Sequence, residues 1–120
     1  MSLATYQRVR SMAETPRAME YRLIGQITGE LLGAWENGLR GPALMPALHR
    51  NREMWSTFSA ACAAPGNELP DQLRAAIISL ALWVDRFTTD VVAGRDTIEP
   101  LVIVNRSILE GLGQGRAVAA

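Results

Sequence analysis

One run of uncharged residues constrains this chain more than any other feature. Between Arg74 and Asp85, residues 75–84 carry no charge and are mostly apolar, so a helix formed there is apolar around its circumference. Such a helix has to be covered by other elements. The run is about half of the ~20 residues that cross a bilayer, so we expect protein and not lipid to cover it. The sequence predicts an all-α fold, a small helical bundle whose central helix at about 70–93 is enclosed on both sides.

Length and charge narrow the class of protein. A chain of 120 residues suits one domain with one core. Twelve basic residues, all Arg, balance twelve acidic ones and alternate with them, so no direct nucleic-acid partner and no membrane insertion are expected. A single cysteine excludes an internal disulfide, and no apolar leader opens the chain. We therefore expect a cytoplasmic protein.

Pro, Gly and Asn residues divide the chain into four main helices and a short N-terminal one. Leu3, Tyr6, Val9 and Met12 recur at three-residue spacing and predict a short amphipathic helix within an arm at 1–15. This arm either lies across a groove of the bundle or detaches to bind a partner. The bundle is expected at 16–112, followed by a flexible tail at 113–120. Its helices are predicted at 16–36, about 42–63, about 70–93 and 100–112.

The second and fourth of these helices share a pattern. The second carries an apolar stripe with one polar interruption: Leu44, Leu48, Asn51, Trp55, Phe58 and Cys62. Asn51 is therefore predicted to be buried, with Arg52 at the edge of the stripe and paired to a carboxylate of the helix at 70–93. Asn105 and Arg106 repeat this pair in the fourth helix. We expect both helices to flank the third, and the Asn amides to satisfy one another or a backbone kink.

Three glycines lie four residues apart in the first main helix. Gly25, Gly29 and Gly33 form a stripe roughly opposite the apolar seam of this helix, although each costs nearly 1 kcal/mol relative to Ala. The seam consists of Glu20, Ile24, Ile27, Leu31 and Ala34 with Trp35. The stripe is either a shallow groove that another helix approaches or an exposed face without function.

The chain carries no recognisable catalytic or metal-binding motif. His49 has no second His or Cys at ligand spacing, and Cys62 on the apolar stripe reads as a core residue. The acidic residues from Asp85 to Glu99 are typical of a solvated face. We expect no enzyme, no metal and no cofactor.

Three motifs, in order, resemble the FlaF family of flagellar biosynthesis regulators. The resemblance covers about residues 6–112. The residues that carry it are Asn51, Arg52 and Trp55, then Asn67, Leu69, Pro70, Leu73, Arg74, Ala75, Ile78, Ser79 and Leu80, and finally Asn105, Arg106, Ile108, Gly111 and Leu112.

The resemblance implies a cytoplasmic helical protein required for flagellin production. Its expected partner is flagellin, with the regulator FlbT and the flagellar export apparatus as further partners, and with no enzymatic activity or cofactor. Flagellin has terminal segments that stay disordered until they pack as amphipathic helices, which suits capture in a groove. The expected function is chaperone-like flagellin binding that couples flagellin synthesis to export. The partner-binding candidates are Asn51, Arg52, Trp55, Asn105, Arg106, Gly25, Gly29 and Gly33.

Two other functions remain open at this point. A direct RNA-binding regulator of flagellin messenger RNA would need a basic stripe with aromatic platforms. A homodimeric adaptor working through FlbT would use Trp35, Trp83 or the glycine stripe as its dimer face. For the two Asn residues, a purely structural role competes with partner contact.

Overall fold

The computed structural model describes residues 2–5 and 16–119, and no strand occurs among them. Residues 3–5 form a helical turn in which Ser2 Oγ accepts a hydrogen bond from the Thr5 backbone N–H at 3.1 Å. Leu3 is 70% exposed. The rest of the predicted N-terminal stripe, through Tyr6, Val9 and Met12, lies outside the described residues.

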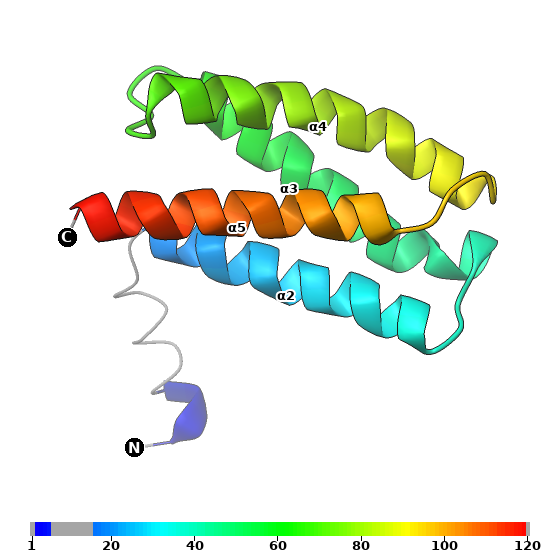
Figure 1. Ribbon diagram of the computed structural model, residues 1–120. Coiled ribbons are helices and arrows are strands. Elements are labelled where there is room, and N and C mark those ends of the chain that lie inside the picture. The colour runs from blue at the N-terminus through cyan, green and yellow to red at the C-terminus, as the bar shows by residue number, and fades with distance from the viewer. Residues whose placement is uncertain (1, 6–15, 120) are drawn as a thin grey trace.

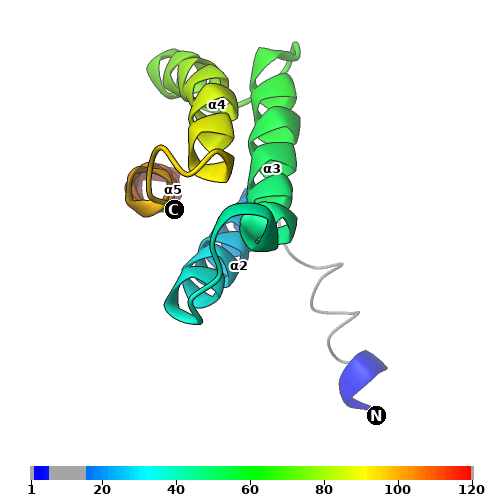
Figure 2. The ribbon, with the colours of Figure 1, turned by 90° about the vertical axis from the view of Figure 1, so that its right-hand side faces the viewer.

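Four α-helices and one short 3-10 helix make up the bundle, so the predicted all-α fold is confirmed. Helix α5 lies between α2 and α4 in Figure 1, and α3 lies behind it, as the turned view in Figure 2 shows. The closest pairings are α3 with α4, α2 with α5, and α2 with α3. The bounds are Pro16–Glu36 for α2, Gly41–Leu44 for η1, Met45–Ala63 for α3, Asp71–Val92 for α4 and Glu99–Ala119 for α5.

Most helix boundaries follow the Pro and Gly signals. Helix α2 begins at Pro16 as predicted, and Pro70 directly precedes α4. Gly94, with a φ of 76°, follows the end of α4 and adopts the left-handed conformation that glycine tolerates best. The predicted end of the last helix at Leu112 is wrong, because α5 continues to Ala119. No Pro follows Leu112 to stop it, and although Gly113 and Gly115 disfavour helix, the Gln, Arg and Ala residues among them and beyond favour it.

The core consists of the inward stripes of all four helices. Every member of the predicted α3 stripe is buried, including Asn51, so this prediction is confirmed. Each fully buried Leu or Ile stabilises the fold by roughly 1.5–3 kcal/mol. The buried partners on the other helices are Ile24, Ile27 and Leu31 of α2, Ile77, Val84 and Val91 of α4, and Leu101, Val102 and Ile108 of α5.

Helix α4 is covered on only part of its surface. Leu82 is 62% exposed, and Ala75, Ala76 and Ser79 are exposed too. The prediction that this helix is enclosed on both sides is therefore wrong. The reason is geometric: α4 occupies a corner of the bundle (Figure 2), where α3 packs on one side, α5 touches a second, and no described element covers the outer face.

The turn between α3 and α4 explains several residues of the second motif. Asn67 Nδ2 donates to the carbonyl oxygen of Ala61 at 3.1 Å, and Asn67 Oδ1 accepts from the Leu69 backbone N–H at 3.0 Å. Arg74 Nε donates to the carbonyl oxygen of Cys62 at 2.8 Å. These side-chain bonds reach carbonyls in the last turn of α3, and the Ala61 carbonyl also accepts from the Ala64 backbone N–H at 3.3 Å. The turn thereby fixes how α4 returns along α3.

Among the described helices, none combines the length and the apolar character that a membrane crossing requires.

Candidate partner-binding site

The two predicted Asn residues meet in a buried hydrogen-bond network. Asn105 Nδ2 of α5 donates to Asn51 Oδ1 of α3 at 2.8 Å and to Thr28 Oγ1 of α2 at 3.0 Å. Trp55 Nε1 donates to Asn105 Oδ1 at 2.8 Å. Thr28 Oγ1 in turn donates to the carbonyl oxygen of Ile24 at 2.7 Å. The network links three helices, and the prediction that the Asn amides satisfy one another is confirmed for the Asn105 Nδ2–Asn51 Oδ1 bond but not for Asn51 Nδ2.

These residues lie inside the core. Asn51 and Asn105 are 0% exposed and Trp55 is 1% exposed. In the closed bundle they hold α2, α3 and α5 in register, as a buried amide does in other helical assemblies. A direct role for them in partner contact stays a prediction, since a partner would reach them only if the helices separated.

One donor of this network has no acceptor. Asn51 Nδ2 is buried and makes no hydrogen bond within the part of the chain that the structure describes. A buried donor without a partner costs about 1–3 kcal/mol. Asn105, by contrast, uses both its oxygen and its nitrogen.

Arg52 lies at the edge of the α3 stripe and holds α4, as predicted. Its Nε is 3.2 Å from Asp85 Oδ1. Its NH2 group donates to the Asp85 carbonyl oxygen at 3.0 Å and to Thr89 Oγ1 at 3.1 Å. The guanidinium is thus engaged within the molecule, and the outward side of this cluster is the Asp85 carboxylate.

The remaining predicted residues are on the surface and are not brought together with that network. Arg106 is exposed and forms no hydrogen bond or ion pair with the residues described. Gly25 and Gly29 are exposed, Gly33 is half-buried, and a Cβ atom added at any of the three would meet no heavy atom within 4 Å. The glycine face of α2 is therefore open.

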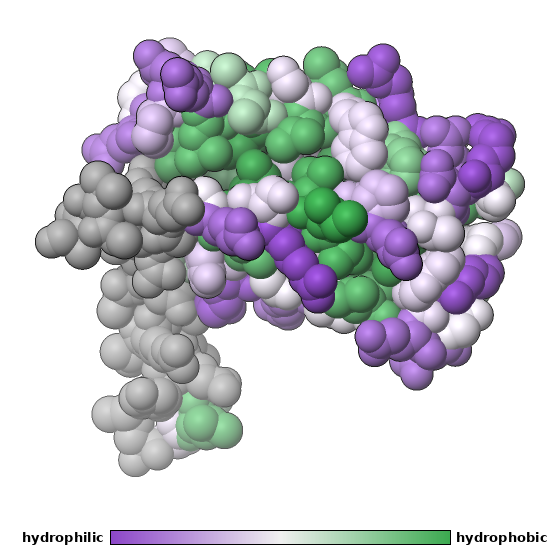
Figure 3. Space-filling model, viewed as in Figure 1, coloured by the Kyte–Doolittle hydropathy of each residue, from purple (hydrophilic) through white to green (hydrophobic). Residues whose placement is uncertain are grey.

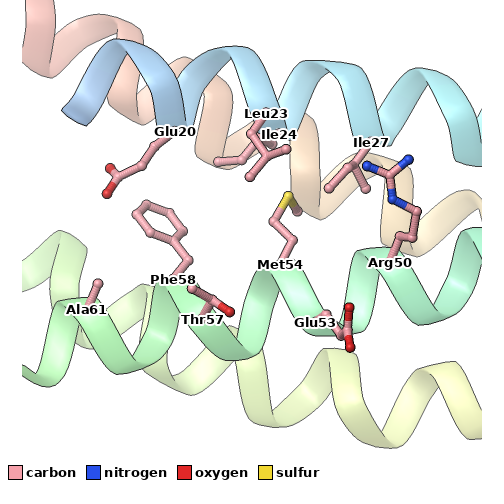
Figure 4. A pocket seen from close by; sticks show the side chains of 10 residues that line it. All are labelled: Glu20, Leu23, Ile24, Ile27, Arg50, Glu53, Met54, Thr57, Phe58 and Ala61. Atoms are coloured by element: carbon pink, nitrogen blue, oxygen red, sulfur yellow. The ribbon is translucent and has the colours of Figure 1, made fainter. Parts of the chain in front are cut away.

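A groove between α2 and α3 is a concave feature that the sequence did not reveal. It has a volume of about 310 Å³ and opens to solvent. Figure 4 shows side chains of both helices pointing into it. The residues that line it are Glu20, Leu23, Ile24 and Ile27 of α2, and Arg50, Glu53, Met54, Thr57, Phe58 and Ala61 of α3.

The groove has an apolar floor and a charged rim. Leu23 is 42% exposed at its wall, while Met54 and Phe58 are 7% and 6% exposed at its floor. The Met side chain adapts readily to the shape of an incoming group. Arg50 closes one end by binding both oxygens of Glu30 at 2.6 Å, and Glu53, paired with His49 at 3.0 Å, lies on the α3 side. This arrangement can accept the apolar face of a helix.

Sequence reasoning missed Leu23 and Thr28. Leu23 lies four residues before Ile27 of the predicted seam of α2, and this spacing was the signal for the groove wall. Thr28 gave no signal, because its burial depends on Asn105, which lies 77 residues further along the chain.

The described residues include no cluster of metal-ligating side chains. No group of three or more His, Cys, Asp or Glu side chains within that part of the chain could hold a metal ion. Burial raises the pKa of the Cys62 thiol, as does the nearby Glu20 carboxylate, while Arg74 lowers it. The net rise keeps the thiol protonated and unreactive at neutral pH.

Comparison with known proteins gives one positive result. No curated protein and no solved structure matches this sequence. The sequence does match the family described as "Flagellar protein FlaF" over residues 2–112, which is nearly the whole chain. FlaF is a flagellar regulatory family and not a family of enzymes. This chain therefore belongs to the FlaF family of flagellar proteins.

Proposed function

We propose that this FlaF protein binds flagellin as a chaperone-like regulator in the cytoplasm and couples flagellin synthesis to export. The observation that carries the proposal is the open apolar groove between α2 and α3 in a member of a flagellar family. FlbT and the export apparatus are its further partners, and contact with flagellin messenger RNA is made by FlbT.

The groove matches the chemistry of an amphipathic helix. A terminal segment of flagellin would place apolar side chains, spaced three and four residues apart, against Leu23, Met54 and Phe58. Glu53 on the rim, with a side chain 66% exposed, favours a Lys or Arg beside that apolar face. Binding would cover apolar surface on both molecules and protect flagellin from aggregation before export.

The balanced charge of the chain supports a protein partner over RNA. Arg50, Arg52, Arg74 and Arg95 are each within ion-pair distance of an Asp or Glu, so they do not form a free basic stripe. Binding to flagellin leader RNA that weakens steeply with salt would instead favour the RNA-binding alternative.

Isothermal titration of the purified chain with flagellin tests the proposal. We expect heat of binding at micromolar concentrations and a rise in the melting temperature of this chain when flagellin is in excess. Leu23→Glu, which places a charge on the groove wall, should weaken binding at least tenfold. Leu39→Glu is the matched control, because Leu39 is similarly exposed at 40% but does not line the groove. Absence of both heat and thermal stabilisation for the unmodified chain would refute flagellin binding.

A further inference from the structure

The outer face of α4 carries a row of five exposed residues. Asp71, Ala75, Ser79, Leu82 and Arg86 follow one another at spacings of 4, 4, 3 and 4, which places them on one side of the helix. Leu82 is 62% exposed in the middle of this α4 row. In Figures 1 and 2 no other helix lies over the outer side of α4, and Figure 3 shows hydrophobic surface extending over α4 and α5.

We propose that the α4 row is the contact between two copies of this chain, with the two α4 helices packed antiparallel. Residues 71 and 86 lie equally far from the middle of the row, and so do residues 75 and 82. In the antiparallel pair, Asp71 of each copy therefore faces Arg86 of the other, and Leu82 of each faces Ala75 of the other. A two-fold axis between residues 78 and 79 makes the contact self-complementary.

The charges of the row favour a second copy as its occupant. Arg86 is exposed and has no hydrogen bond or ion pair with the residues described in the structure. The Asp71 side chain is 98% exposed, and among the described residues its one ion-pair contact is with Arg74 at 3.5 Å. A single row that carries an acid at one end and a base at the other pairs with its own reversed copy at both ends.

The sizes of the central residues fit the same register. Ala75 and Ser79 are small, so the two helix backbones can approach closely at the middle of the row. The larger Leu82 of each copy then fills the space over Ala75 of the other, as large and small residues interdigitate in packed helices. The contact covers Ala75, Ser79 and Leu82, three of the four residues of the uncharged run at 75–84 that the bundle leaves exposed.

The row is short, so we expect a reversible dimer. Asp71 and Arg86 are about 22 Å apart along a helix that rises 1.5 Å per residue. A single pair of helices over this length buries less than a standard interface. The α4 row includes no residue of the groove between α2 and α3, so this dimer is independent of flagellin binding.

Sedimentation equilibrium of the full chain tests for the dimer, over a range of roughly 1 to 200 μM that brackets a micromolar Kd. We expect the mean mass to rise from monomer to dimer across this range. Leu82→Glu should raise the dimer Kd at least tenfold, whereas Leu39→Glu, on an exposed leucine outside the row, should leave it unchanged. Circular dichroism of each variant checks that the helices are intact.

Charge reversal tests the antiparallel register. Arg86→Glu alone faces Asp71 of the second copy, and Asp71→Arg alone faces Arg86, so each variant by itself should dimerise at least tenfold more weakly. An equimolar mixture of the two variants restores an opposite-charge pair at both ends of the row. The mixture should therefore form a heterodimer with a Kd close to that of the unmodified chain.

Three results would overturn the proposal. The first is a chain that stays monomeric across the whole range. The second is a dimer that Leu82→Glu leaves unchanged, since another surface would then form it, and the third is a mixture of the charge variants that stays monomeric. If the unmodified chain is monomeric and Leu82→Glu abolishes flagellin binding, the α4 row belongs to flagellin and not to a second copy.

Discussion

Asn105 and Asn51 lie side by side in the core but differ in how many hydrogen bonds their side chains make. Within the described part of the chain, the Asn105 side chain makes three hydrogen bonds, to Trp55, Asn51 and Thr28, whereas the Asn51 side chain makes one and leaves its Nδ2 without a partner. Replacing Asn105 removes partners from several buried groups at once, while replacing Asn51 also removes an unsatisfied donor. The two substitutions should therefore differ in cost.

We predict that Asn105→Leu lowers the free energy of unfolding by about 2–4 kcal/mol and Asn51→Leu by about 1 kcal/mol or less. Urea unfolding followed by circular dichroism measures both. Equal losses for the two variants would contradict the hydrogen-bond pattern described for this network.

The two arginines that follow these Asn residues should also differ. Arg52→Ala removes the link between α3 and α4 and should cost about 1 kcal/mol. Arg106→Ala, at an exposed position without a partner among the described residues, should change stability by no more than about 0.5 kcal/mol. Thermal unfolding measures both effects, and a large loss for Arg106→Ala would assign that residue to the scaffold. If Arg106 contacts flagellin, Arg106→Ala should weaken flagellin binding with helicity intact.

The Cys62 thiol should be unreactive in the folded protein. Its pKa is raised chiefly by burial and next by the Glu20 carboxylate, so the thiol keeps its proton at neutral pH. We expect it to react with a thiol reagent at least ~100-fold more slowly in the native chain than in urea, because reaction requires local opening. The raised pKa also makes the contribution of Cys62 to the free energy of unfolding depend on pH. This contribution is fully present below the pKa of the unfolded thiol, about 8.5, and is lost as pH rises above it. Equal reaction rates in the native and unfolded chains would show that Cys62 is accessible.

At the scale of the element, substitutions at the glycines of α2 should affect the stability of the protein and its binding to a partner differently. A Cβ added at Gly25, Gly29 or Gly33 would meet no heavy atom within 4 Å, so Ala fits each position. Replacing all three should stabilise the protein by about 2–3 kcal/mol, from roughly 0.8–1.0 kcal/mol per helix-interior glycine.

The same triple variant tests whether the glycine face of α2 contacts flagellin. If a partner helix approaches that face closely, flagellin affinity should fall while the melting temperature rises. Unchanged affinity would leave the α2–α3 groove as the binding surface and would make the glycine stripe an exposed face without function. A fall in melting temperature would contradict the open surroundings of the three glycines.

Local signals predicted the elements well. Pro16 marked the start of α2, the stripe from Leu44 to Cys62 marked the buried face of α3, and Arg52 was correctly assigned to the edge facing α4. These features depend on residues within one or two helical turns. The end of α5 was missed because no single residue after Leu112 determines it.

At the scale of the whole molecule, the sequence pattern did not predict how the helices are arranged around one another. The apolar run at 75–84 shows that α4 needs cover, but it cannot tell whether neighbours of the same chain or another chain supply it, and Leu82 is exposed in this bundle. The α2–α3 groove depends on the distance between two helices, which no periodicity within one helix specifies. The Asn pairing was predictable only because the pattern of α3 recurs in α5.

Flagellin capture in the α2–α3 groove is the central claim, and site-specific photo-crosslinking tests it most directly. A photoreactive amino acid is introduced in place of Thr57, which is exposed and lines the groove, and as a control in place of Ser107, which is exposed on α5 outside it. Irradiation in the presence of purified flagellin should give a crosslinked product from position 57 and little or none from position 107. Crosslinking from position 107 but not from 57, or from neither position, would contradict the claim.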